Sequence, residues 1–265
     1  MWSLYWRLVG ARVRSQMQYK TSFGLDLLGF GLMISMEFVA VVVLFGRFPS
    51  VGGWNLAEIA LLYGLTSLAF SFAEMVGRGF DLPFEQMMQR GTFDAVLIRP
   101  QGSFFQVLAS EFQLRRLGRS LQAVVVLVYA FAHLPVVWTP AKVLLVPLTL
   151  ASGTVIYLAL LVFSATICFW TIAAPEVINI FTYGGEFMTN YPLGIYNRWL
   201  RSVMIFVVPL AFINYPAALV LLQRTDPYGF PPALAWASPL VASAFFGGAC
   251  LCWRFGVSKY QSSGS

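Results

Sequence analysis

Long apolar stretches, separated by short polar segments, dominate the pattern of this chain. A helix needs about 20 mainly apolar residues to cross a bilayer, and several stretches reach or approach that length. They lie at residues 23–45, 56–76, 120–134, 143–170, 172–191, 203–222 and 233–253. Three arginines precede the third stretch, and we expect them to anchor its cytoplasmic end. They are Arg115, Arg116 and Arg119.

The last third of the chain is less regular than the rest. The stretch 172–191 contains Glu176 and Glu186, and the stretch 203–222 is interrupted by Pro209, Asn214 and Pro216. Interrupted helices are tolerated at membrane depth only where they are buried in protein or line a watery cavity. We therefore expect one of these two stretches not to cross the membrane completely.

The distribution of basic residues decides between six and seven spans. With six spans, the arginines before residue 20, the segment 77–119 and Arg254 with Lys259 all face the cytoplasm, as the positive-inside rule prefers. The prediction is an all-α polytopic membrane protein with six transmembrane helices and both termini cytoplasmic. A re-entrant element over residues 192–222, beginning at Pro192, would lie between spans five and six.

Residues 1–20 form a basic amphipathic segment. Trp2, Trp6, Val9, Val13 and Met17 follow a spacing of about four and form one apolar stripe. This pattern is typical of a helix that lies in the membrane interface with its tryptophans at headgroup depth. A signal peptide is disfavoured, because no small-residue cleavage site follows the apolar run.

The segment 77–103 is polar although spans flank it on both sides. Pro83 suits the start of a short helix and Gly91 suits its left-handed end. Asp94 is expected to cap a second short turn that Pro100 ends. The simplest alternative is a solvated connection, but ordinary connections need only a few residues. We therefore predict a surface hairpin that meets a partner.

The composition agrees with the membrane class. Hydrophobic residues make up 58% of the 265 and charged residues only 11%, whereas soluble domains carry about 25% charged residues. The net charge of +6 is explained by topology and lipid headgroups, so the bilayer is a partner and nucleic acid is not. The three cysteines lie in apolar runs and His133 lies at a helix end, so neither residue type indicates a catalytic or metal site.

The chain lacks the motifs of common catalytic and nucleotide sites. It contains no GxxxxGK[ST], HExxH, CxxC or GxSxG, so we expect no catalysis, no bound metal and no cofactor of its own. Glu37, Glu176 and Glu186 are carboxylates within apolar stretches, and such groups are functional candidates because burying them is costly. The two later carboxylates either line a pathway, are neutral, or pair with Arg198 or Arg201. Glu74 and Arg78 are four residues apart and can pair on one helix face.

Several short motifs resemble the bacterial ABC-2-type transporter permeases, specifically a compact group of about 260 residues. RGTFDAVLIRP at 90–100 and the P-x-AF-x-x-x-P spacing at 209–216 are the most specific. The others run through nearly the whole chain. They are YKTSF (19–23), GGW with LLYG (52–64), FW (169–170), YPLGIY (191–196), VVPLAFINYPAALVL (207–221) and WRFGVSKYQSSGS (253–265).

The resemblance implies a permease subunit of an ATP-binding-cassette transporter in the bacterial inner membrane. Two permease subunits, identical or related, would sit on two cytoplasmic P-loop ATPase subunits that bind ATP and Mg²⁺. The loop after the second span would carry a coupling helix that docks on the ATPase. Residues at that contact would be Asp81, Phe84, Glu85, Met88, Arg90, Asp94 and Arg99. The resemblance implies export as the direction of transport. An apolar path with few charges would suit a hydrophobic or amphipathic substrate.

Two other classes of function remain as alternatives at this point. An ATP-independent channel or secondary carrier is disfavoured because residues 1–130 and 131–265 show no internal repeat. A membrane-embedded enzyme is disfavoured because no metal or nucleophile constellation is present.

Overall fold

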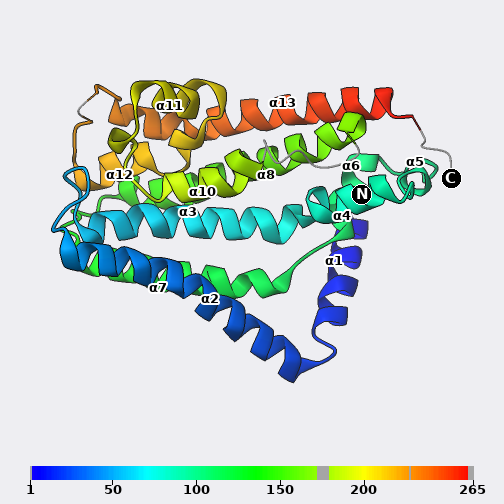
Figure 1. Ribbon diagram of the computed structural model, residues 1–265, viewed down its shortest axis with the longest axis horizontal. Helices are drawn as coiled ribbons and strands as arrows, with labels where there is room; N and C mark the ends of the chain where they lie inside the picture. The colour runs from blue at the N-terminus through cyan, green and yellow to red at the C-terminus, as the bar shows by residue number, and fades with distance from the viewer. Residues whose placement is uncertain (1, 172–178, 227, 262–265) are drawn as a thin grey trace.

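The fold of the computed structural model is built from helices, which pack as a layered bundle (Figure 1). The structure describes residues 2–171, 179–226 and 228–261. The longer helices in these ranges are α1 (Trp2–Gln16), α2 (Lys20–Arg47), α3 (Leu56–Gly77), α4 (Leu82–Gln89), α6 (Ser103–Ser110), α7 (Leu117–His133), α8 (Pro140–Thr171), α12 (Tyr215–Leu222) and α13 (Ser238–Lys259). The shorter ones are η1 (Arg78–Phe80), α5 (Asp94–Leu97), η2 (Leu114–Arg116), η3 (Ile180–Gly184), α10 (Gly185–Thr189), η4 (Leu193–Ile195), α11 (Arg198–Ser202), η5 (Val203–Val207), η6 (Leu210–Ile213) and η7 (Pro232–Ala237).

Helix α3 is the centre of the bundle. It is apolar on all sides, as expected of a helix with neighbours all round, and most of its side chains are fully buried. It packs against α7 on one side and α8 on the other, and α8 in turn packs against α13. In Figure 1 these helices run side by side along the long axis of the molecule.

The first four expected stretches agree with α2, α3, α7 and α8 to within three residues, whereas the last, 233–253, ends six residues before α13 does. Four helical segments are long and apolar enough to cross a membrane, by length and composition, in the parts of the chain that the structure covers: Lys20–Arg47, Leu56–Gln89, Pro140–Thr171 and Pro232–Lys259. Helix α7 has 17 residues and spans a similar part of the long axis. The start of α3 has a local cause, since Asn55 and Glu58 form a capping box in which each side chain binds the other's backbone N–H.

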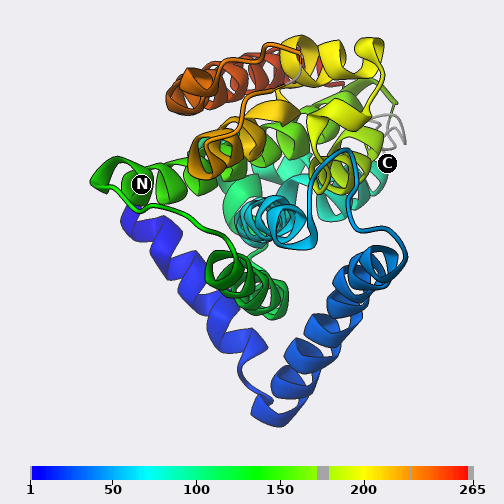
Figure 2. The same cartoon turned by 90° about the vertical axis from the view of Figure 1, so that its left-hand side faces the viewer.

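The amino-terminal helices lie apart from the main bundle. Figure 2 shows α1 and α2, in blue, as the two arms of a V below the rest of the molecule. Helix α2 meets α7 where Gly31 and Gly118 bring the two backbones together. The apolar positions expected on α1 divide between two surroundings, and its place in the membrane interface stays a prediction. Tyr5 and Val9 pack against Phe105 and Ala109 of α6, whereas Trp6 faces outward with 64% of its surface exposed.

Residues 190–222 form an interrupted hairpin at the end of the bundle opposite the chain termini (Figure 1). The π-helical turn η5 ends before Pro209, where backbone hydrogen bonding in the helix is interrupted. The chain then turns through η6 and Asn214 and returns as α12, with Pro216 in its first turn. Pro192 precedes η4 in extended conformation.

Candidate functional site: a surface hairpin and a buried charge network

The polar segment after α3 folds as a compact helical hairpin at the end of the molecule where both termini lie (Figure 1). Pro83 lies in the first turn of α4, and Gly91 follows that helix with a φ of +66°, so both sequence predictions are confirmed. The expected cap of the second turn is wrong. Helix α5 begins at Asp94, and Phe93, whose side chain is fully buried, takes the N-cap position.

An aromatic cluster fixes this hairpin to the membrane helices. Phe84 is fully buried and makes edge-to-face contacts with Phe93 and with Phe169 of α8, and its ring also packs on Trp253 of α13. Met88 is buried in the same cluster. Phe84 and Met88 therefore offer no surface to a partner, and their expected role at a contact is corrected to anchoring the hairpin.

The remaining expected contact residues lie on or near the surface. Arg90 and Arg99 are exposed, and Glu85 and Asp94 are half-buried. Asp81 faces inward and forms an ion pair with Arg78. Two apolar side chains that sequence reasoning missed are also presented there, Ile98 with 85% and Leu82 with 48% of their surface exposed.

A charge cluster around Glu74 joins the root of the hairpin to the bundle. Glu74 is completely buried near the end of α3, and Arg116 reaches it with Nη2 at 2.8 Å. Arg78 lies 3.5 Å from the same carboxylate, which confirms the predicted pair. The hydroxyl of Tyr183 in η3 accepts from Arg78 at 3.0 Å and donates to Asp81 at 2.6 Å. The cluster thus connects α3, the hairpin and η3.

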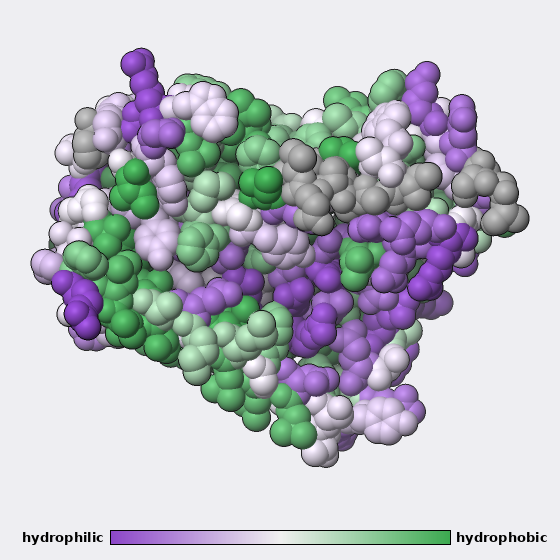
Figure 3. All heavy atoms as spheres, in the orientation of Figure 1, coloured by the Kyte–Doolittle hydropathy of each residue, from purple (hydrophilic) through white to green (hydrophobic). Residues whose placement is uncertain are grey.

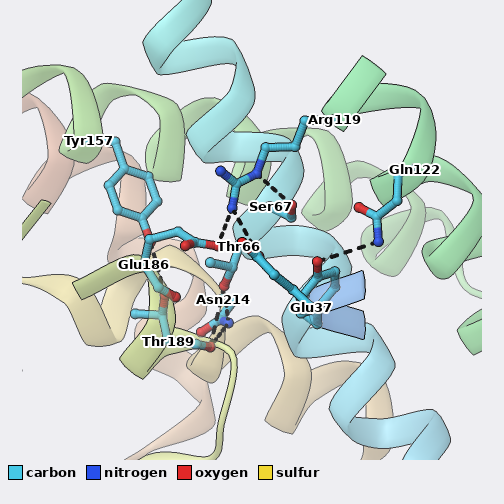
Figure 4. Close-up of polar contacts among 10 residues, drawn as sticks. Glu37, Thr66, Ser67, Arg119, Gln122, Tyr157, Glu186, Thr189 and Asn214 are labelled. Atoms are coloured by element: carbon cyan, nitrogen blue, oxygen red, sulfur yellow. Dashed lines mark hydrogen bonds and ion pairs between the residues drawn. The ribbon is translucent and has the colours of Figure 1, made fainter. Parts of the chain in front are cut away.

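A second buried cluster is centred on Arg119, deeper in the bundle (Figure 4). The Nη2 atom of Arg119 donates to Glu186 of α10 at 2.6 Å and lies 3.9 Å from Glu37 of α2. Its Nε atom donates to Ser67 of α3 at 3.0 Å. Arg119 is only 4% exposed and also lies over the Phe70 ring.

These contacts correct two expectations. Arg116 and Arg119 do not anchor a helix end in the headgroups, because each neutralises a carboxylate inside the bundle. Glu186 pairs with Arg119 and not with Arg198 or Arg201. The spacing of Arg116 and Arg119 in the sequence is the signal that could have indicated this buried pairing. It places both side chains on one face at the start of an apolar helix.

A neutral hydrogen-bond network continues from this cluster toward the opposite end of the molecule. The amide of Asn214 is buried and donates to the Thr66 hydroxyl at 2.7 Å and to the Thr189 carbonyl at 2.6 Å. Tyr157 of α8 bonds the Thr189 hydroxyl at 2.9 Å. Asn214 thereby fixes the tip of the interrupted hairpin to α3 and α10 (Figure 4).

The structure brings some candidate pathway residues together and separates others. Glu37 and Glu186 meet at Arg119, and the Glu37 side chain on α2 keeps 46% of its surface exposed. Asn214 and the three prolines belong to the interrupted hairpin, whereas Glu176 lies outside the described residues. Within the described ranges, no group of three or more His, Cys, Asp and Glu side chains is placed to hold a metal ion.

The helices long enough to span a membrane, the buried charges and the surface hairpin define the chain as a membrane-embedded helical protein. Its surface agrees with this class, since Figure 3 shows hydrophobic side chains over the lower part of the bundle and hydrophilic ones toward the end that holds the termini. The model of the ABC-2 family transporter proteins matches residues 31–264, so the chain belongs to that family and is a permease subunit. Comparison with curated proteins and with solved structures gives no match.

Proposed function

We propose that this chain is the permease subunit of an ATP-driven exporter of a hydrophobic or amphipathic substrate. Two such subunits, identical or related, would assemble in the bacterial inner membrane with two P-loop ATPase subunits that bind ATP and Mg²⁺. Family membership supports a transporter that works with an ATPase. The hairpin over residues 77–103 supports docking on an ATPase. The aromatic cluster anchors it to the bundle, while its charged and apolar side chains are exposed on the surface.

The arrangement of helices supports six spans with both termini cytoplasmic. Helices α3, α7, α8 and α13 run along the long axis of the molecule, α2 packs on α7, and η3 and α10 lie against α8 and α3 (Figure 1). The hairpin over 192–222 would then be re-entrant from the outer side. The termini and the proposed docking surface would share the cytoplasmic end.

The Glu74 cluster supplies a route for mechanical coupling. ATP binding would draw the two ATPases together, and the docked hairpins would move with them. ATP can drive this movement only if it binds one conformational state of the transporter more tightly than the other. Arg78 and Asp81 form the root of the hairpin and bond to Glu74 of α3 and Tyr183 of η3. Movement of the hairpin would therefore shift α3 and η3 together.

A tagged pull-down in mild detergent tests the proposal. We expect a P-loop ATPase to co-purify with the wild-type chain and to be lost from the double variant Glu85→Lys/Asp94→Lys. The matched control is Arg254→Glu/Lys259→Glu, which reverses two exposed charges on α13 at the same end but outside the hairpin. Retention of the ATPase by the hairpin variant would refute the docking surface. Absence of any ATPase across several detergents would refute the ATP-driven transporter.

A further inference from the structure

A cavity of about 610 Å³ lies at the end of the molecule opposite the termini, between α11, η7 and the start of α13. This volume is in the range of small-molecule pockets. Its walls are mainly apolar and include three phenylalanines and two aliphatic side chains: Phe206, Phe212, Phe230, Leu234 and Val241. Phe206 is 83% exposed, so the apolar surface continues from the cavity to the outside.

Two guanidinium groups line the same cavity. Arg198 and Arg201 are three residues apart on α11, and neither forms an ion pair with any carboxylate of the described ranges. Arg201 lies 3.6 Å above the ring of Tyr228, which holds the guanidinium in place through its apolar face. This stacking leaves the N–H groups at the edge of the guanidinium available to an acceptor.

Among the described residues that line the cavity, the one carboxylate already accepts three hydrogen bonds from the chain. Asp226 accepts from the Tyr215 hydroxyl and from the backbone N–H groups of Tyr228 and Phe230. It is 9% exposed and shapes the loop before η7. The cavity therefore presents two cationic groups whose charge no neighbouring acid neutralises by direct contact.

Other cations at this end of the molecule form ion pairs or hydrogen bonds with groups of the chain itself. Arg224 pairs with Glu58 at 3.3 Å and donates to the Gly53 carbonyl, and the Lys142 ammonium donates to the Leu221 carbonyl at 3.1 Å. If this end faces outward, positive residues are disfavoured there by the positive-inside rule. Within the described ranges Arg198 and Arg201 have no carboxylate or carbonyl partner of this kind, so a bound ligand accounts for their charges better than the fold does.

We propose that this cavity binds an amphiphile with an anionic headgroup, its apolar chain against the phenylalanines and its phosphate or carboxylate on Arg198 and Arg201. Guanidinium groups bind such oxyanions through paired N–H donors. The inference rests on the proposed function in one respect, since it narrows the exported substrate to an anionic amphiphile. The same chemistry occurs in acidic phospholipids of the membrane, and the test separates the two sources.

Photo-labelling of the full-length chain in maltoside detergent tests the site. The probe is tetradecyl phosphate with a diazirine at the end of its chain, and labelled peptides are mapped by mass spectrometry. We expect labelling between residues 203 and 241, competed by unlabelled tetradecyl phosphate but not by tetradecyltrimethylammonium. The variant Arg198→Gln/Arg201→Gln should reduce labelling at least tenfold, whereas Arg254→Gln, which removes an exposed arginine of α13 at the opposite end, should leave it unchanged.

A second variant tests the apolar wall without touching the charges. Leu234→Trp fills the cavity and should also reduce labelling. Equal labelling of wild type and the double arginine variant, labelling confined to other segments, or equal competition by the cationic amphiphile would each overturn the proposal. Circular dichroism and elution volume of each variant show that loss of labelling does not reflect unfolding.

The source of the ligand follows from two further measurements. A resident lipid predicts an acidic phospholipid that co-purifies with the wild type and is lost from the double arginine variant. An exported substrate predicts that tetradecyl phosphate stimulates ATP hydrolysis by the assembled transporter, and that the double arginine variant abolishes this stimulation. Labelling requires no ATPase, so the cavity and the proposed transporter can fail independently of each other.

Discussion

At the scale of single residues, Glu186 is the partner nearest to the charge that Arg119 carries inside the bundle, closer than Glu37. Arg119 and Glu186 are 2.6 Å apart and each is less than 10% exposed. Removing one partner of such a pair costs about 3–5 kcal/mol because it leaves the other charge buried and unpaired, whereas replacing both by apolar groups is often neutral. We therefore expect Arg119→Met to lower the thermal stability of the purified protein strongly.

The double variant Arg119→Met/Glu186→Leu should recover most of the stability lost in the single variant, as measured by thermal melting in detergent. Arg115→Met is the matched control, because Arg115 is exposed and its side-chain bond to Gln113 is long at 3.4 Å. It should change the melting temperature little. If Arg119→Met melts like the control, or the double variant is less stable than the single one, the pair does not have the role assigned to it.

At the scale of structural elements, the surface hairpin separates anchoring residues from exposed ones. Phe84 is fully buried in the aromatic cluster, and truncating a buried phenylalanine costs about 3–5 kcal/mol. We expect Phe84→Ala to destabilise the isolated permease. Ile98→Ala should leave its melting temperature unchanged but weaken retention of the ATPase, because Ile98 is 85% exposed on the same hairpin. Thermal melting and the pull-down, done on both variants, check the two effects, and a stable Phe84→Ala protein would contradict the anchoring role.

The contact between α2 and α7 depends on a glycine. A Cβ added at Gly118 would meet the backbone carbonyl oxygen of Leu27 at 2.5 Å and the backbone nitrogen of Gly31 at 3.1 Å. Since backbone atoms cannot move aside as a flexible side chain can, Gly118→Ala should push α2 off the bundle and lower the melting temperature. Gly29→Ala is the control on α2, where a Cβ meets nothing within 4 Å. It should be neutral or stabilising by up to about 1 kcal/mol, since alanine favours helix over glycine.

Much of the helical layout was predictable from the sequence. Long apolar stretches and the proline and glycine positions near residues 83 and 91 act locally, and the helices begin and end close to where these signals place them. The partners of the buried charges were not predictable. Glu186 and Arg119 are 67 residues apart and meet only after α3, α7 and α10 have packed together.

The same reason explains the errors at the surface hairpin. A polar segment was expected to face outward as a whole, but Phe84 and Met88 recur at helical spacing and find an apolar surface on α8 and α13. Two residues four apart in a short helix do not reveal from sequence whether they meet a partner or the chain's own core. Only the position of Phe169 and Trp253 decides it.

At the scale of the whole molecule, the two charge clusters and the hydrogen bonds of Asn214 form a line of buried polar groups through an otherwise apolar bundle. It begins at the hairpin root with Arg78, passes Glu74 and Arg119, and ends at Asn214 on the interrupted hairpin. Buried polar networks of this kind specify one arrangement of helices, because each member left without a partner is costly. The line therefore connects the proposed ATPase contact with the end that holds the proposed amphiphile site.

This arrangement makes a prediction about topology that distinguishes six spans from four. If only the four helical segments that meet the length and apolarity criteria crossed the membrane, α7 would stay on the cytoplasmic side and so would Trp138, which follows it. If six segments cross, Trp138 lies outside with Ser50, while Gly102 and Gln261 lie inside. All four positions are exposed and suit single cysteines in a background that carries Cys168→Ala, Cys250→Ala and Cys252→Ala.

We expect a membrane-impermeant maleimide to label Ser50→Cys and Trp138→Cys in intact spheroplasts, and Gly102→Cys and Gln261→Cys only after lysis. Protection of Trp138→Cys before lysis would favour four spans, and labelling of Gln261→Cys before lysis would favour an odd number.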